Sequence, residues 1–316
     1  MPRIRQPVVR GDAGLAFRCR AFTLIEALVV VFIVSLLLAM LLAAVMSARE
    51  AARRNQCLGN LRQIGMAVQN YISTHSVLPL GYESGRGASF LVAVLPYLDQ
   101  QRLFNVFQGG GGATVSGVSL SVFICPSDGA AARPDLGSTN YAGNEGSGAL
   151  RYGYNGAFAL NRAIGPRDFR DGLSNTALAS EWLVGPANML ARDPLRSVFH
   201  TPTTWEKPGQ LDAFALECRD LDPATASVAP PTIGAPWTHG DLGHSLYNHV
   251  LPPNQNTCLD GSLYQFGAWT SKSRHSGGAQ SVFADGHARF IASGIEISVW
   301  RALGSRNGRE MIGSEY

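Results

Sequence analysis

The sequence has few charged residues, and their charges nearly balance. Asp, Glu, Lys and Arg make up 16% of the 316 residues, and the formal net charge is only +3. An excess this small gives no reason to expect nucleic-acid binding, because that function requires a strongly basic surface. Hydrophobic residues, at 46%, are too abundant for a disordered chain. We therefore expect a folded protein whose partners do not include nucleic acid.

Common catalytic and cofactor-binding motifs are missing as well. The chain contains no Gly-x-Ser-x-Gly nucleophile elbow, no phosphate-binding loop and no dinucleotide fingerprint. Its cysteines show neither a Cys-x-x-Cys pair nor zinc-finger spacing. These absences favour a protein that is not an enzyme and that has no cofactor and no metal centre.

Proline is missing between Val8 and Pro79, which leaves room for a long helix. Residues 27–46 are twenty consecutive uncharged residues, and a helix of that length spans about 30 Å, the thickness of a bilayer core. Residues 47–75 continue with helix-forming residues and carry one apolar stripe. The stripe consists of Leu58, Leu61, Ile64, Val68 and Ile72. We expect one helix over residues 22–75, with a transmembrane segment at 27–46 and an outer half that packs on a head domain.

Positive charge is concentrated before the apolar run. The arginines there are Arg3, Arg5, Arg10, Arg18 and Arg20. The positive-inside rule then keeps residues 1–21 in the cytoplasm and places the chain beyond Met46 on the extracytoplasmic side. An ordinary signal peptide, cleaved within the alanine-rich residues 40–48, is the alternative. Glu26 argues against that alternative, because a carboxylate at the edge of the membrane is costly without a partner.

The residues at this edge resemble a known processing signal. Phe22-Thr23-Leu24-Ile25-Glu26 is similar to the prepilin motif of type IV pilins and type II secretion pseudopilins. The resemblance implies that a prepilin peptidase cuts between Ala21 and Phe22, removes residues 1–21 as a leader, and that the new amino terminus is methylated. It also implies a single-pass inner-membrane anchor and assembly with other pseudopilin-like subunits, in which Glu26 pairs with a neighbour's α-amino group. Ala21 departs from the glycine that usually precedes the cut.

Four cysteines remain if Cys19 is removed with the leader. These are Cys57, Cys125, Cys218 and Cys258. They form an even set in an oxidising compartment, so we expect one or two structural disulfides. Four cysteines allow three pairings, and the sequence does not choose among them.

The chain beyond Gly81 has the composition of strands and loops, because short apolar runs alternate with Gly, Pro, Asn and Asp. Near its end, two β-prone segments flank Asp285-Gly286, which predicts a hairpin over residues 279–291. We therefore expect an α+β, pilin-like fold. Its long amino-terminal helix packs on an antiparallel β-sheet head, residues 76–316, that carries long loop insertions.

The head resembles a large bacterial family of unknown function, abundant in planctomycetes, that joins a prepilin-type start to a carboxyl-terminal signature. The signature is a His, nine residues, then Asp-Gly, and here it is formed by His275, Asp285 and Gly286. Further matching segments are Asn-Leu-Arg-Gln-Ile-Gly at 60–65, Cys-Pro-Ser-Asp at 125–128, Tyr-Ala-Gly-Asn at 141–144, the segment 171–181 from Asp-Gly to Glu, and Tyr-Asn-His at 247–249. The family has no established activity, although its members are sometimes labelled solute-binding-protein-like. We expect the signature residues to have a structural role.

Two histidine arrangements are candidates for chemistry. Four side chains of metal-ligand type lie within eleven residues, namely His239, Asp241, His244 and His249. Their spacing is not the i, i+4 spacing of one helical face, so a surface loop is favoured over a metal site. His275 and Asp285 are suitable for an acid–base pair, but hydrogen bonds that fix turns are the favoured role for both.

The sequence therefore predicts a non-catalytic, membrane-anchored, pseudopilin-like structural subunit of a type II secretion or pilus-like assembly. The first alternative is a tethered extracytoplasmic protein whose head binds a carbohydrate or a peptide. The second is a tethered metal-dependent hydrolase that uses the histidines between 239 and 249.

Overall fold

The structure, a computed structural model, describes residues 23–129, 136–148, 155–186, 188, 191–205, 208–230, 233–260 and 267–310. The predicted leader, residues 1–21, lies outside the described residues. The chain divides into two units, Met1–Arg49 and Glu50–Tyr316.

One long helix dominates the amino-terminal part of the chain, and the other helices are short. Helix α1 covers Leu24–His75. The other α-helices are α2 (Phe90–Ala93), α3 (Gln101–Gln108), α4 (Gly112–Ser116), α5 (Leu211–Asp220) and α6 (Ile297–Gly304). Short 3-10 helices occur at η1 (Leu95–Leu98), η2 (Ser121–Phe123), η3 (Pro166–Asp168) and η4 (Pro208–Gln210).

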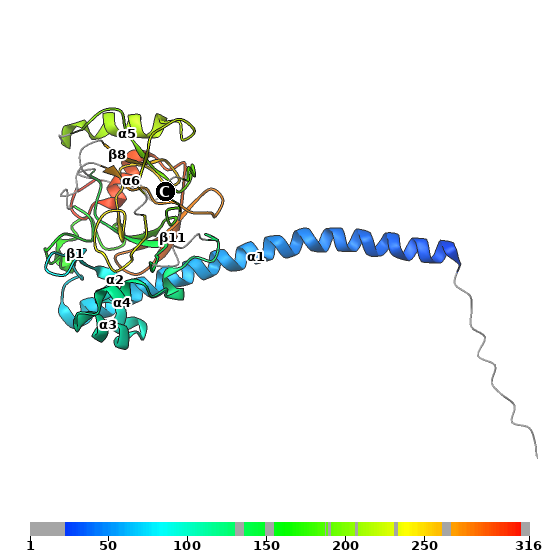
Figure 1. The fold of residues 1–316 in the computed structure, drawn as a ribbon, viewed down its shortest axis with the longest axis horizontal. Coiled ribbons are helices and arrows are strands. Elements are labelled where there is room, and N and C mark those ends of the chain that lie inside the picture. The colour runs from blue at the N-terminus through cyan, green and yellow to red at the C-terminus, as the bar shows by residue number, and fades with distance from the viewer. Residues whose placement is uncertain are drawn as a thin grey trace, which may run out of the picture. The chain divides into compact units, whose positions relative to one another are not determined.

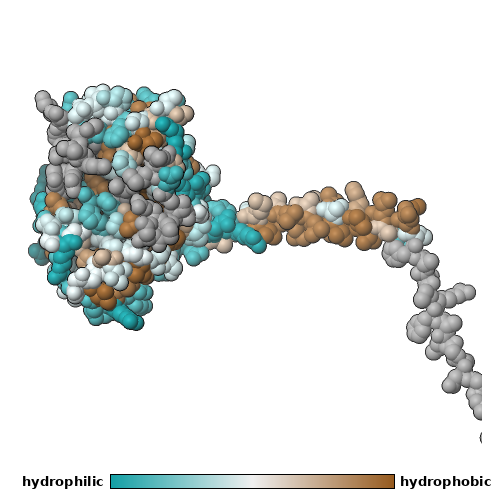
Figure 2. All heavy atoms as spheres, viewed as in Figure 1, coloured by the Kyte–Doolittle hydropathy of each residue, from teal (hydrophilic) through white to brown (hydrophobic). Residues whose placement is uncertain are grey.

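The first half of α1 carries an exposed apolar surface. Its large apolar side chains between Leu24 and Met46 are 44–79% exposed, and Figure 2 shows a nearly continuous hydrophobic surface along this stretch. Within the part of the chain that the structure describes, α1 is the one helix long and apolar enough to cross a membrane. The predicted long apolar helix is confirmed.

The second half of α1 is part of the core of the head. Leu61, Ile64 and Val68 are completely buried, whereas Leu58 and Ile72 are half-buried. The predicted apolar stripe is therefore confirmed, since residues at these spacings share one face of a helix.

Among the described residues, the head is built on two main sheets and a small hairpin. The strands are β1 (Tyr82–Glu83), β2 (Ala88–Ser89), β3 (Tyr141–Asn144), β4 (Ala177–Glu181), β5 (Val198–His200), β6 (Val228–Ala229), β7 (Leu246–Tyr247), β8 (Thr257–Leu259), β9 (Gly267–Ala268), β10 (Gly278–Phe283) and β11 (Ala288–Ala292). The five-stranded sheet has the order β11-β10-β4-β3-β7, the four-stranded sheet has the order β6-β5-β8-β9, and β1 pairs with β2. Pairing is antiparallel except for β3 with β7 and β5 with β8. The predicted α+β class is confirmed.

The predicted carboxyl-terminal hairpin is also present. Strands β10 and β11 pair antiparallel, with Val282 opposite Ala288. Gly286 occupies the turn with φ +92°, a conformation that favours glycine. The Asp285 carboxylate accepts a hydrogen bond from the His287 backbone N–H at 3.0 Å, which closes the turn.

The core of the head consists of a large hydrophobic cluster and a smaller one. The large cluster includes the buried face of α1, strands of both main sheets, and Trp182, Trp237 and Trp300. The smaller cluster lies between α5 and β8, and includes Phe214 and Val250. Helices α3 and α4 lie at one end of the head and α5 lies at the other (Figure 1).

Candidate functional site

Segments that are far apart in the sequence meet beneath the second half of α1. In the five-stranded sheet, β4 lies between β3 and β10, and Tyr141 is directly opposite Glu181. His275 lies three residues before β10, and the Cys57–Cys125 disulfide joins α1 to the segment that follows η2. The matching segments at 125–128, 141–144 and 171–181 and the histidine of the carboxyl-terminal signature therefore supply one buried cluster.

His275 is the centre of this cluster. It is only 2% exposed. Its Nδ1 lies 3.0 Å from Glu50 Oε1, while its Nε2 lies 3.7 Å from Glu181 Oε1 and 3.8 Å from Cys125 Sγ. One ring nitrogen thus faces a carboxylate on α1, and the other faces a second carboxylate and a disulfide sulfur.

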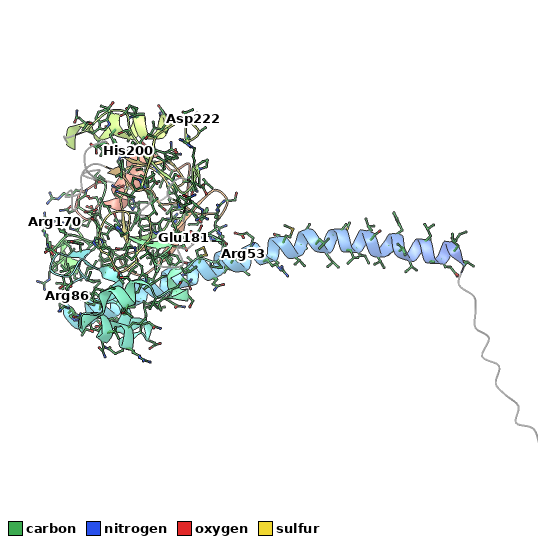
Figure 3. All side chains as sticks on the ribbon, in the orientation of Figure 1. Arg53, Arg86, Arg170, Glu181, His200 and Asp222 are labelled. Carbon is green, nitrogen blue, oxygen red and sulfur yellow. A yellow bond between two sulfur atoms is a disulfide. The ribbon has the colours of Figure 1, made fainter. Side chains whose placement is uncertain are left out.

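Glu181, at the end of β4, is a buried carboxylate with one satisfied oxygen. The residue is 2% exposed, and its Oε2 accepts a hydrogen bond from the Gln280 backbone N–H at 3.0 Å. Its Oε1 has no hydrogen-bond partner among the described residues. Burial raises the pKa of Glu181, although the Gln280 amide and His275 act in the opposite direction. Figure 3 shows Glu181 among the side chains of the head and Arg53 projecting from α1.

Glu50 is the more exposed carboxylate of the cluster. Its Oε2 forms an ion pair with Arg53 at 2.9 Å, and its Oε1 accepts hydrogen bonds from His275 and, at 3.3 Å, from the Ser127 hydroxyl. Burial acts to raise the pKa of Glu50, but the hydrogen bonds from His275 and Arg53 outweigh it and lower the pKa. The hydrogen bonds from His275 and Arg53 therefore favour the charged form of Glu50.

The disulfide residues are anchored by backbone hydrogen bonds. The Tyr141 hydroxyl donates to the Cys57 carbonyl at 3.2 Å, and the Cys125 N–H donates to the Asn140 side chain at 3.0 Å. The second disulfide joins Cys218 of α5 to Cys258 of β8. The sequence left three pairings of the four cysteines open, and the structure pairs Cys57 with Cys125 and Cys218 with Cys258.

The structure does not bring His275 and Asp285 together as an acid–base pair. His275 faces Glu50 and Glu181, whereas the Asp285 carboxylate lies 2.6 Å from His287 Nδ1 at the hairpin turn. Gly286 lies at the same turn, with the aliphatic part of Gln69 as its neighbour. The two halves of the signature thus have separate positions, one in the cluster and one in the turn.

The histidines between 239 and 249 do not converge on one point. The rings of His239 and His244 lie 4.7 Å apart. His249 is completely buried elsewhere, where its Nδ1 lies 2.8 Å from the Trp300 carbonyl and its Nε2 lies 2.7 Å from the Tyr247 hydroxyl. The expected surface loop is wrong for this end of the segment, because β7 pairs with β3 and carries His249 into the core.

The structure describes only part of the predicted processing signal. Ala21 and Phe22 lie outside the described residues. Glu26 lies in the first turn of α1, where its Oε2 accepts hydrogen bonds from the backbone N–H and the hydroxyl of Thr23, each at 2.9 Å. The Glu26 N–H donates back to the Thr23 hydroxyl at 3.3 Å, which completes a capping box.

Sequence profiles of known families match both parts of the chain. A profile described as "Protein of unknown function (DUF1559)" matches residues 46–298. The chain belongs to the DUF1559 family. A second profile, the prokaryotic N-terminal methylation motif, matches residues 17–42. No curated protein and no solved structure matches the chain.

The two matches together describe a pilin-like, membrane-anchored protein with a DUF1559 head. The methylation motif covers Glu26 and most of the apolar stretch, and the DUF1559 match covers the buried cluster around His275. Sequence reasoning missed the partners of His275. Glu181 could have been noticed, because it ends the matching segment 171–181. Glu50 lies in none of the matching segments, so no sequence pattern was a reason to select it.

Proposed function

We propose that this chain is a non-catalytic structural subunit of a type II secretion or pilus-like assembly. In this proposal, a prepilin peptidase removes the leader, α1 anchors the protein in the inner membrane with its amino terminus on the cytoplasmic side, and the head is extracytoplasmic. The observation that carries the proposal is the exposed apolar surface of α1 between Leu24 and Met46, in which Glu26 is the single charged residue.

Glu26 gives this surface a means of assembly. Its carboxylate accepts hydrogen bonds from Thr23 but has no cation beside it in the described chain. In a membrane, a neighbouring copy's α-amino group supplies the missing positive charge, and the charge pair aligns the two helices. The apolar side chains that surround Glu26 then pack against the same neighbour.

The geometry of the buried cluster around His275 supports a structural role rather than a catalytic one. His275 and Glu181 are each only 2% exposed, and His275 is held between Glu50 and Glu181. A substrate would reach these groups only if α1 moved away from the sheet. The disulfide between Cys57 and Cys125 opposes that movement.

Co-purification of two tagged copies tests the assembly role. When both copies are expressed with a prepilin peptidase and crosslinked in the membrane, we expect Glu26→Val to reduce recovery of the second copy at least tenfold. Glu296→Val, which removes an exposed acid from the head, is the matched control and should leave recovery unchanged. Membrane retention should be the same for all three proteins. Equal recovery with Glu26→Val would contradict the proposal.

A cavity in the head favours one second candidate, a tethered ligand-binding protein. The cavity has a volume of about 380 Å³ and lies where the end of α1 meets α2 and α3. Its walls include Tyr71, Tyr97, Phe104 and Phe107, and Glu83 supplies a carboxylate. Aromatic faces beside a few polar groups are typical of sites for carbohydrates and peptides.

The two candidate functions predict different effects for substitutions at Tyr97 and Glu26. If the head is a tethered receptor, Tyr97→Ala should abolish binding in a calorimetric screen of oligosaccharides and short peptides, and Glu26→Val should leave that binding intact. If the chain is a structural subunit alone, no member of the panel should bind the detergent-solubilised protein, and only Glu26→Val should have a phenotype.

A further inference from the structure

Four potential metal ligands meet beside α1, in a site separate from the assembly surface. They are Cys57, Cys125, Glu181 and His275. One ligand atom from each lies within 4.8 Å of the others, and all four residues are buried. Neither the proposed assembly role nor ligand binding in the cavity uses these four side chains together.

One atom of this group lacks a partner that a buried atom requires. Glu181 Oε1 has no hydrogen-bond donor among the described residues, although Glu181 is 2% exposed. The nearest ring nitrogen, His275 Nε2, is 3.7 Å away, which is too far for a hydrogen bond. A buried carboxylate oxygen without a donor is costly, and a bound cation would remove that cost.

Glu50 orients His275 for coordination. Because the Glu50 carboxylate is an acceptor, the hydrogen bond at 3.0 Å places a proton on His275 Nδ1. The lone pair of the neutral ring then lies on Nε2, which points toward Glu181 and Cys125. In many zinc proteins a carboxylate accepts a hydrogen bond from one nitrogen of a histidine whose other nitrogen binds the metal. The carboxylate thereby fixes the tautomer of the histidine ligand.

We propose that the reduced form of this chain binds one Zn²⁺ through the thiolates of Cys57 and Cys125, Glu181 Oε1 and His275 Nε2. Tetrahedral zinc with bonds of about 2.0–2.3 Å separates its ligand atoms by about 3.3–3.8 Å. The distances of 3.7 Å from Nε2 to Oε1 and 3.8 Å from Nε2 to Sγ fit this spacing. Two thiolates, an imidazole and a carboxylate also favour Zn²⁺ over Ca²⁺ or Mg²⁺.

The disulfide and the metal are mutually exclusive. A dithiol reductant first transfers two electrons and two protons to the disulfide, which gives two thiols and the oxidised, cyclic form of the reductant. Zn²⁺ binding then releases the two thiol protons, and also the carboxyl proton if Glu181 carries one. The site therefore has an oxidised, covalent state and a reduced, zinc-bound state.

Both states hold α1 on the head. Cys57 lies on α1, whereas Cys125, Glu181 and His275 belong to the segments that α1 covers. Loss of the disulfide in a reducing environment would leave α1 held by packing and hydrogen bonds, without a covalent link. Zinc replaces the covalent link with a coordinate one at the same position.

Metal analysis of the full-length, detergent-solubilised protein tests the proposal. The test uses the background Cys19→Ser, Cys218→Ser, Cys258→Ser, in which only the pair of interest remains, with the unaltered chain in parallel. After reduction with a dithiol and removal of the reductant without oxygen, we expect one Zn²⁺ per chain by elemental analysis. The oxidised protein should retain less than a tenth of that amount. Co²⁺ in place of zinc should give thiolate-to-metal charge-transfer absorption.

Variants separate coordination from general stability. In that background, Glu181→Gln and His275→Gln should weaken zinc binding at least tenfold in a competition titration, and Glu50→Gln should weaken it about tenfold. Glu296→Gln, an exposed acid on the head, should have no effect. Circular dichroism follows folding in each sample.

A reduced chain that unfolds and recovers its fold when Zn²⁺ is added would support the proposal. A folded reduced chain without stoichiometric zinc, an unfolded one that zinc does not rescue, or full affinity in Glu181→Gln would overturn it.

Discussion

Gly65 of helix α1 lies directly against Val282 of strand β10. A Cβ atom at position 65 would be 2.7 Å from Val282 Cγ2, which is closer than carbon atoms approach without strain. The helix therefore packs closely on the sheet at the last residue of the Asn-Leu-Arg-Gln-Ile-Gly segment. The same close packing places Glu50 and Cys57 over the cluster around His275.

Alanine at this position should destabilise the head. We expect Gly65→Ala to lower the free energy of unfolding by about 1–2 kcal/mol, because Val282 is completely buried and its methyl group has no free space. Gly59→Ala is the matched control, since a Cβ atom there has no neighbour within 4 Å. Gly59→Ala should raise the free energy of unfolding by about 0.5–1 kcal/mol, because alanine has a higher helix propensity than glycine. Denaturant titration followed by tryptophan fluorescence measures both, and a stabilising effect of both substitutions would contradict the close contact.

A buried ion pair should be a second sensitive position. Asp128 and Arg196 form a contact of 2.5 Å, and their side chains are 1% and 7% exposed. Arg196→Met leaves the Asp128 charge buried without its cation, so we expect a loss of about 3–5 kcal/mol in the same titration. The double variant Asp128→Asn, Arg196→Met should recover part of that loss. An equal or larger loss in the double variant would show that the pair is not the cause.

Acid should destabilise the head through His249. Burial lowers the pKa of His249 to about 3, although the hydrogen bond to the Trp300 carbonyl acts in the opposite direction. Its ordinary pKa is about 6.5, so between those values the unfolded chain binds a proton that the folded chain does not. The stabilisation is complete above pH 6.5 and is lost as the pH falls toward 3, by about 5 kcal/mol in all.

Thermal unfolding between pH 7 and pH 4 measures this effect. His249→Gln should flatten the pH dependence even if it lowers stability at pH 7, because glutamine does not titrate. An unchanged slope in His249→Gln would contradict the assignment.

Local features of the fold could be predicted from the sequence because their causes are local. Twenty uncharged residues and a stripe at spacings of three and four are sufficient to predict α1, and Asp285-Gly286 is sufficient to predict the turn between β10 and β11. The α+β class follows from the same signals. The parallel pairing of β3 with β7 could not be predicted, because it joins segments about a hundred residues apart.

The buried cluster could be predicted only in part. His275 carries a sequence signature, but its neighbours depend on how α1, β4 and the segment around Cys125 meet, and no local pattern encodes that meeting. The pairing of Cys57 with Cys125 spans 68 residues and depends on the same packing. His249 shows the reverse error: its position among glycines and other histidines indicated an exposed loop, whereas the sheet carries it against Trp300.

Mass spectrometry of the mature amino terminus tests whether the chain is processed and anchored as a prepilin. The protein is purified from membranes of cells that contain a prepilin peptidase, and its amino-terminal peptide is sequenced. We expect the chain to begin at Phe22, with a methylated α-amino group and with Glu26 as the fifth residue. An unprocessed chain that still begins at Met1, or a chain that begins near residue 48 and has lost the apolar half of α1, would contradict this expectation.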